Sequence, residues 1–145
     1  MNDYTIFTDG AYSSSRKQGG SAFIILRDGQ KVLEWSQGWK NGTNNTAEIL
    51  AILVAISTFK KPVKSITIYS DSMYLVGGMT LGWSTAVNSD LWEQLCDLKA
   101  SLLDRVHFVH VNGHSGHFGN EVVDQLAVIS SKNKIYDRSN SNTGN

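Results

Sequence analysis

Residues 21–39 read Ser-Ala-Phe-Ile-Ile-Leu-Arg-Asp-Gly-Gln-Lys-Val-Leu-Glu-Trp-Ser-Gln-Gly-Trp. Ser21–Arg27 and Lys31–Trp39 are rich in apolar and β-branched residues, which favours two strands. The dipeptide Asp28-Gly29 between them is a strong hairpin signal, because both residue types tolerate the positive φ that a two-residue turn requires. This stretch therefore predicts two neighbouring antiparallel strands.

The segments on either side of this hairpin predict a further strand and a helix. Tyr4–Asp9 comes before it, with β-branched and aromatic residues up to Gly10, so we expect a first strand that completes an antiparallel meander of three. Thr46–Lys60 comes after it and is predicted to be a helix that Pro62 stops. Its apolar residues follow helical spacing: Ile49, Ile52, Leu53, Ile56 and Phe59.

The second half of the chain alternates strands and helices. The pattern predicts, in order, the strand Ser65–Ser70, the helices Ser72–Thr80 and Ser89–Leu103, the strand Val106–Val111 and the helix Asn120–Ser131. The order βββαβααβα indicates an α/β fold with a five-stranded mixed sheet, three antiparallel strands and then two parallel ones, flanked by helices. We expect one domain over residues 1–131 and a flexible polar tail over 132–145.

Composition and charge limit the functional classes. With 145 residues, 41% hydrophobic and 18% charged, the chain has the composition of one soluble globular domain. No apolar run approaches the roughly 20 residues that cross a bilayer, the first residues lack a secretory pattern, and Cys96 is the only cysteine. We therefore expect a cytoplasmic protein without a membrane partner. A monomer is the default expectation, and the sequence indicates no obligate protein partner.

The net charge is zero, with 13 basic and 13 acidic residues, which by itself argues against a nucleic-acid partner. If four acids hold metal, 13 basic residues face 9 acidic ones, a surplus of +4. Such a modest surplus predicts weak affinity for a phosphate backbone, and binding that fades as salt rises.

Two aspartates follow similar strand sequences. Asp9 follows Thr5-Ile6-Phe7-Thr8 and Asp71 follows Thr67-Ile68-Tyr69-Ser70, so both carboxylates emerge at one sheet edge if the strands are parallel neighbours. Carboxylates that lie so close to each other repel unless they are protonated or bridged by a cation. Mg²⁺ prefers oxygen ligands of this kind. The alternative interpretation is that each aspartate simply begins a turn.

Two further acids lie in predicted helices. Glu48 has the spacing of a capping box with Asn45, yet it also lies close to the apolar stripe, where a carboxylate needs a partner. Asp124 follows the N-cap candidate Asn120, and the helix dipole favours an acid there whatever its function.

The acids occur in four motifs whose order and spacing resemble type 1 ribonuclease H, from about Tyr4 to Ile129. The motifs are Phe7-Thr8-Asp9-Gly10, Thr43-Asn44-Asn45-Thr46-Ala47-Glu48, Tyr69-Ser70-Asp71-Ser72-Met73-Tyr74 and Gly113-His114-Ser115-Gly116-His117-Phe118-Gly119-Asn120-Glu121-Val122-Val123-Asp124. The resemblance implies the ribonuclease H-like fold and an endonuclease that cuts the RNA strand of RNA–DNA hybrids, leaving 5′-phosphate and 3′-hydroxyl ends.

By the same resemblance, Asp9, Glu48, Asp71 and Asp124 are catalytic residues that bind metal. Two Mg²⁺ ions, about 3.5–4 Å apart, would flank the scissile phosphate, with Mn²⁺ as a possible substitute. His114, in a glycine-rich loop, matches the histidine that assists the family's chemistry or product release, and its ordinary pKa of about 6.5 suits a proton shuttle.

The resemblance also implies a set of substrate contacts, which read the 2′-hydroxyl that separates RNA from DNA. Asn44 and Asn45 match minor-groove contacts, although both can instead cap the helix. Thr43 is a candidate phosphate contact, and Trp83 can stack on the DNA strand or belong to the core. The substrate-binding candidates are Gly10, Thr43, Asn44, Asn45, Met73 and Trp83.

The chain departs from the family in two places. The segment 81–88, where many relatives carry a basic protrusion, has no lysine or arginine, and the loop 13–18 lacks an Asn-Pro-Gly type turn. We expect both departures to weaken substrate binding without abolishing chemistry. Haloacid dehalogenase-like phosphatases are excluded, because their nucleophilic aspartate would fall at Phe7. A non-catalytic hybrid-binding domain is disfavoured because all four acids are present.

Overall fold

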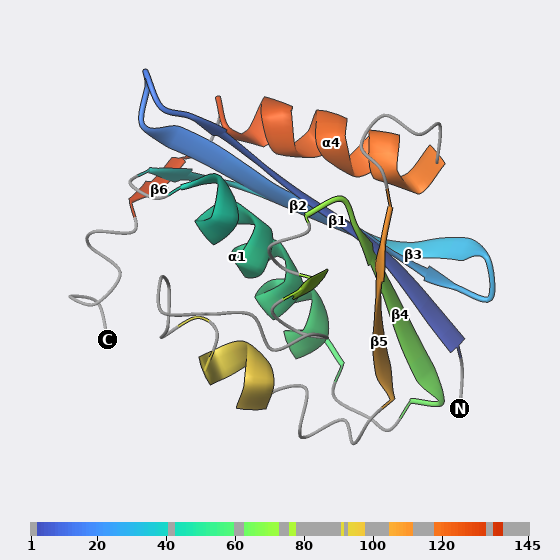
Figure 1. The fold of residues 1–145 in the computed structure, drawn as a ribbon. Coiled ribbons are helices and arrows are strands. Elements are labelled where there is room, and N and C mark those ends of the chain that lie inside the picture. Colours follow the sequence, from blue (N-terminus) through green and yellow to red (C-terminus); the bar gives the residue numbers. More distant parts are fainter. Residues whose placement is uncertain are drawn as a thin grey trace.

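A computed structural model describes residues 3–40, 43–59, 63–72, 76–77, 91, 93–97, 105–111, 118–132 and 135–137. These residues form one mixed sheet of six strands in the spatial order β5-β4-β1-β2-β3-β6 (Figure 1). The strands are β1 (Asp3–Ser13), β2 (Gln18–Arg27), β3 (Gln30–Lys40), β4 (Ser65–Ser70), β5 (Val106–His110) and β6 (Ile135–Asp137). Helices α1 (Asn44–Ser57) and α4 (Phe118–Ser130) lie on opposite faces of the sheet.

The predicted meander is confirmed, because β1 pairs antiparallel with β2 and β2 pairs antiparallel with β3. Asp28 and Gly29 form the hairpin turn with φ angles of 50° and 86°, the left-handed conformation that this kind of turn requires at both positions. The first strand is longer than predicted. It does not end at Asp9 but runs on to Ser13, since it stays paired with β2 up to Ser13↔Gln18.

The parallel half of the sheet is also confirmed. Helix α1 carries the chain across the sheet, so that β4 lies parallel to β1 and β5 lies parallel to β4. The β1–β4 pairing ends at Phe7↔Tyr69, whereas β1 continues to Ser13 beside β2. We call the position beside residues 9–13 of β1, beyond the end of β4, the sheet notch.

Two hydrophobic cores lie on the two faces of the sheet. Consecutive residues of β2 alternate between them, as strand geometry requires: Phe23 packs with α1, and Ile24 packs with α4. The core on the α1 face is built from large aliphatic side chains, among them Ile6, Ile25, Ile49, Ile52, Ile56, Ile66, Ile68 and Leu95. The core on the α4 face is smaller: Ala22, Ile24, Val123 and Ala127.

The structure differs from the predicted elements at several ends. Helix α4 begins at Phe118, so Asn120 lies inside the helix and not at its cap, and α1 ends at Ser57 and not at residue 60. Of the predicted helices 72–80 and 89–103, residues 76–77, 91 and 93–97 are helical, and most of the remainder lies outside the described residues. Within the predicted tail, β6 pairs parallel with β3. In the described part of the chain, no helix is long and apolar enough to cross a membrane.

Candidate metal centre

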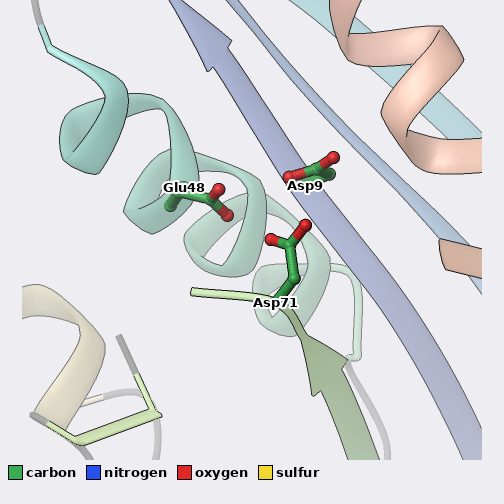
Figure 2. A group of neighbouring side chains, drawn as sticks. All are labelled: Asp9, Glu48 and Asp71. Carbon is green, nitrogen blue, oxygen red and sulfur yellow. The ribbon is translucent and has the colours of Figure 1, made fainter. Parts of the chain in front are cut away.

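Three acidic side chains meet at the sheet notch. Asp9 lies within β1, Asp71 comes directly after β4, and Glu48 lies in the second turn of α1. Each offers a carboxylate oxygen, and these oxygens all lie within 4.8 Å of one another. Figure 2 shows the three carboxylates facing one another from three different elements. The structure thus brings together residues separated by 39 and 23 positions in the chain (48 − 9 and 71 − 48).

Asp9 and Glu48 approach from opposite faces of the sheet. Phe7 and Ala11 pack against the core on the α4 face, and strand alternation places Asp9 on the same face. Glu48 belongs to α1, which covers the other face. The two carboxylates can meet because β4 has already ended at the notch, so its backbone does not separate them.

Gly10 allows this approach by having no side chain. A Cβ at this position would lie 2.6 Å from the Glu48 nitrogen and 2.8 Å from the Ala47 carbonyl carbon, closer than real Cβ atoms come. The backbone N–H of Gly10 also donates to Asp9 Oδ1 at 2.9 Å. Gly10 therefore lets the first turns of α1 rest on β1 and gives one acid a hydrogen-bond donor.

The start of α1 shows that Glu48 is not a capping residue. Thr43 is the N-cap, and its Oγ1 accepts a hydrogen bond from the Thr46 backbone N–H at 3.1 Å. Glu48 comes two residues further on, beyond the capping-box position, with only 3% of its surface exposed. Its Oε2 is buried and has no hydrogen-bond partner in the structure. A buried carboxylate oxygen without a donor is costly unless something else neutralises it.

The chain around Asp71 is held by its buried neighbour Ser70. The Ser70 hydroxyl accepts a hydrogen bond from the Ser72 backbone N–H at 3.1 Å, and Val111 N–H donates to the Ser70 carbonyl at 2.9 Å. Directly before the acids, the rings of Phe7 and Tyr69 stack across the β1–β4 pair with centroids 5.1 Å apart. These contacts fix the direction in which the chain leaves β4 and therefore the position of Asp71.

The electrostatics show the cost of this crowding. Burial is the largest cause that raises the pKa of Asp9, from 3.8 to about 8, followed by the charge of Asp71 and a hydrogen bond with the Asp124 side chain. Hydrogen bonds with the Glu48 side chain and the Gly10 amide lower the pKa in part. Burial and the charges of Asp9 and Asp71 also raise the pKa of Glu48 well above its ordinary value. Without a cation, the cluster relieves its repulsion by holding protons.

Asp124 reaches the cluster from α4. Its side chain interacts with that of Asp9 and helps to raise the Asp9 pKa. Helix α4 lies so close to β1 here that a Cβ on Gly119 would overlap the ring of Phe7. Asp124 is half-buried and is not among the three acids that share the 4.8 Å cluster.

The remaining predicted residues are placed only in part. Asn45 is half-buried and Thr43 is exposed at the start of α1, where Asn44 is the first helical residue. His114, Met73 and Trp83 lie outside the described residues.

Sequence reasoning missed Thr8, which is fully buried and whose Oγ1 has no hydrogen-bond partner in the structure. Its signal was a polar side chain at an inward position of an apolar strand.

The donor set fits a hard divalent cation. It consists of carboxylate oxygens from three elements, two of them on nearly fully buried side chains, and one oxygen has no protein donor. Such ions take oxygen ligands and relieve the repulsion between neighbouring carboxylates. The cluster can therefore bind metal, in competition with the protons that its raised pKa values indicate.

Comparisons with known proteins agree with this fold. A family model described as RNase H matches residues 1–132. The chain is 36% identical to the ribonuclease H of Desulforamulus reducens, over 91% of this chain and 89% of the relative. It is 38% identical to the ribonuclease H of Trichodesmium erythraeum, over 90% and 89%.

Solved structures share the fold at lower sequence identity. LC11-RNase H1, isolated from compost, superposes with a TM-score of 0.78 at 22% identity, over 91% of this chain and 97% of that one. A structure of LC11-RNase H1 in complex with an RNA/DNA hybrid gives a TM-score of 0.77 at 20% identity, over 89% and 96%. The matching family model and the similar relatives show that this chain belongs to the ribonuclease H family and is a nuclease.

Proposed function

We propose that this chain hydrolyses the RNA strand of RNA–DNA hybrids in a metal-dependent reaction that leaves 5′-phosphate and 3′-hydroxyl ends. The observation that carries the proposal is the cluster of Asp9, Glu48 and Asp71, whose oxygens lie within 4.8 Å in a member of a nuclease family. A structure with the same fold has been solved with an RNA/DNA hybrid, which supports this substrate class.

Asp9, Glu48, Asp71 and Asp124 would hold the metal. Two Mg²⁺ ions, or Mn²⁺ in their place, would lower the pKa of the attacking water and neutralise charge on the leaving oxygen. The chain's own part is to present deprotonated carboxylates at fixed positions. Gly10 contributes directly, because its N–H bonds to Asp9 and favours the charged form of that acid.

The start of α1 is the proposed contact with the substrate. Thr43, Asn44 and Asn45 lie one to two turns before Glu48, so groups that bind the RNA strand there would hold it beside the acids. We assign Gly10, Met73 and Trp83 to the same substrate surface and His114 to proton transfer or product release, on the family resemblance. We also place the enzyme in the cytoplasm, as its single cysteine suggests, and take a monomer as the default state.

A cleavage assay on labelled nucleic acids tests the proposal. We expect cleavage of the RNA strand in a hybrid with Mg²⁺ or Mn²⁺, and none of double-stranded DNA, double-stranded RNA or single strands. Chelator should abolish the reaction, and end-group analysis should find 5′-phosphates. RNA cleavage that persists in chelator would contradict a metal-dependent reaction.

A matched pair of glutamate variants connects the activity to the cluster. Glu48→Gln should lower the cleavage rate by at least about 100-fold, since loss of a ligand should exceed the 10–100-fold typical of residues that only support ligands. Glu34→Gln changes an exposed glutamate on β3 that pairs with Lys31 at 3.0 Å, and it should keep the wild-type rate. Equal rates in the two variants would remove Glu48 from the site.

A further inference from the structure

Beneath the first turns of α1, two side chains of the sheet form a buried polar relay, here called the Ser21 relay. The indole Nε1–H of Trp39 on β3 donates to Ser21 Oγ on β2 at 2.7 Å, and Ser21 Oγ donates to the Ala47 carbonyl oxygen in α1 at 2.6 Å. An indole N–H can only donate, so the single hydroxyl proton of Ser21 must go to Ala47. The direction of both hydrogen bonds is therefore fixed.

The relay lies next to the closest contact between α1 and the sheet. Ser21 is directly opposite Gly10 in the β1–β2 register, and Gly10 is the residue that lets Ala47 and Glu48 rest on β1. Ser21 is fully buried, and half-buried Trp39 packs against the core on the α1 face. The same turn of α1 is thus held by two neighbouring strands, through van der Waals contact on β1 and through a hydrogen bond on β2.

Glu48 needs such support because its side chain has little of its own. Its Oε2 has no hydrogen-bond partner in the structure, and the charges of Asp9 and Asp71 oppose its ionised form, against which the Gly10 backbone supplies a hydrogen bond. The position of the carboxylate therefore depends on how firmly its backbone is held. The Ala47 carbonyl and the Glu48 nitrogen belong to one peptide group, which is rigid, so fixing one fixes the other.

We propose that Ser21 and Trp39 are positioning residues that hold Glu48 in the metal-binding cluster by anchoring the Ala47–Glu48 peptide. The inference rests on the proposed metal site. It assigns to β2 and β3, which contribute no acid to the cluster, a part in setting how strongly the cluster binds a cation. Removing the Ser21 hydroxyl leaves the Trp39 N–H and the Ala47 carbonyl without this link and lets α1 shift from β1.

The test measures Mn²⁺ binding by calorimetry on the protein without nucleic acid, together with kcat and KM on a hybrid. Ser21→Ala should weaken Mn²⁺ binding about 10-fold, in the range typical of residues that orient a ligand. Its kcat should fall by a larger factor than KM for the hybrid rises, because Ser21 anchors the peptide of a proposed metal ligand and is not itself a proposed substrate contact. Trp39→Phe keeps the Ser21 hydroxyl and removes the indole N–H that donates to it. This variant should also weaken Mn²⁺ binding, by a smaller factor than Ser21→Ala.

Trp35→Phe is the matched control. Trp35 lies on the same strand, packs against the same core and stacks on Phe23 with ring centroids 5.2 Å apart. Its loss should lower the thermal midpoint while Mn²⁺ binding keeps its wild-type strength. If Ser21→Ala does not fold, Trp39→Phe carries the comparison with Trp35→Phe.

The outcomes separate this inference from the function on which it rests. Wild-type Mn²⁺ affinity in both Ser21→Ala and Trp39→Phe would overturn the positioning role, and so would an equal loss in Trp35→Phe. A wild-type protein that binds no Mn²⁺ would overturn the metal site itself and this inference with it.

Discussion

The dipeptide Asp-Gly occurs twice in the described chain, and its two copies have opposite environments. Asp28-Gly29 is exposed at the tip of the β2–β3 hairpin, with both residues in the left-handed conformation. Asp9-Gly10 lies inside a strand, where Asp9 is 3% exposed and remains paired with Ala22 of β2. The same two residues make a turn in one place and the centre of an acidic cluster in the other.

The two glycines are required for different physical reasons. At Gly29 a Cβ would meet nothing within 4 Å, and what matters is the φ of 86°. Gly10 is not among the residues with positive φ, but a Cβ there would collide with the backbone of α1. One glycine supplies conformational freedom and the other supplies space. A local sequence pattern can reveal the first need, whereas the second depends on which helix packs against the strand.

The largest difference between the copies should come from replacing the aspartates. Asp9→Asn should lower the rate of hybrid cleavage by more than about 100-fold, because a metal ligand and its charge are lost. Asp28→Asn should leave the rate unchanged, since asparagine tolerates the left-handed conformation. Steady-state cleavage with Mg²⁺ measures both. Full activity in Asp9→Asn would show that the cluster is not the catalytic centre.

The second-largest difference between the two Asp-Gly copies should be in how each aspartate affects the pH dependence of stability. In the unfolded chain Asp9 ionises near its ordinary pKa of 3.8, and in the folded protein burial and its acidic neighbours raise that pKa to about 8. Between these values the folded state holds a proton that the unfolded state has lost, so raising the pH favours unfolding. The free energy of unfolding in chelator should fall from pH 4 to pH 8, by about 1.4 kcal/mol for each pKa unit between the two states.

Urea unfolding of three proteins at several pH values checks this expectation. The fall should be weaker in Asp9→Asn, which should also be more stable than wild type without metal at pH 8, because one repelling charge is gone. Asp28→Asn should follow the wild-type curve. A wild-type stability that rises over this pH range would mean that the folded acids are not held in their protonated forms.

The smallest difference concerns the glycines. Gly10→Ala should destabilise the protein by about 1–3 kcal/mol, as overpacking does, and should reduce cleavage because α1 and Glu48 are pushed from β1. Gly29→Ala should cost about 1–2 kcal/mol, through backbone conformation alone, and should leave cleavage unchanged. Chemical unfolding with parallel rate measurements separates the two. Equal effects on cleavage would show that Gly10 has no special steric role.

The sequence was sufficient where a structural need is local. Asp28-Gly29 predicted the hairpin because the turn is defined by its own two residues, and alternating strands and crossover helices predicted the parallel pairing of β4 with β1. The ends of elements were less predictable. Asp9 was expected to end its strand, but its pairing with β2 continues, and pairing depends on a partner elsewhere in the chain.

The site shows the same limit. The spacing of Glu48 fitted both a capping box and a buried ligand, and only the position of the N-cap at Thr43 separates these interpretations. The Ser21 relay had no sequence signal beyond a serine in a strand, because both of its hydrogen bonds link residues distant in the chain. Strand β6 has three residues, too few for a periodic pattern to appear.

The parallel pairing of β1 with β4 sets the order in which this protein can become an enzyme during synthesis. The hairpin needs only residues up to Lys40. The β1–β4 pair, in contrast, joins residues far apart in the chain: Asp3 and Ser65, which share a hydrogen bond, are 62 positions apart. A nascent chain that stops before Asp71 contains the residues of the meander and α1, yet it holds only two of the three clustered acids. Nuclease competence therefore cannot precede the end of the fourth strand, and with the proposed set of ligands it also needs Asp124, which comes later, in α4.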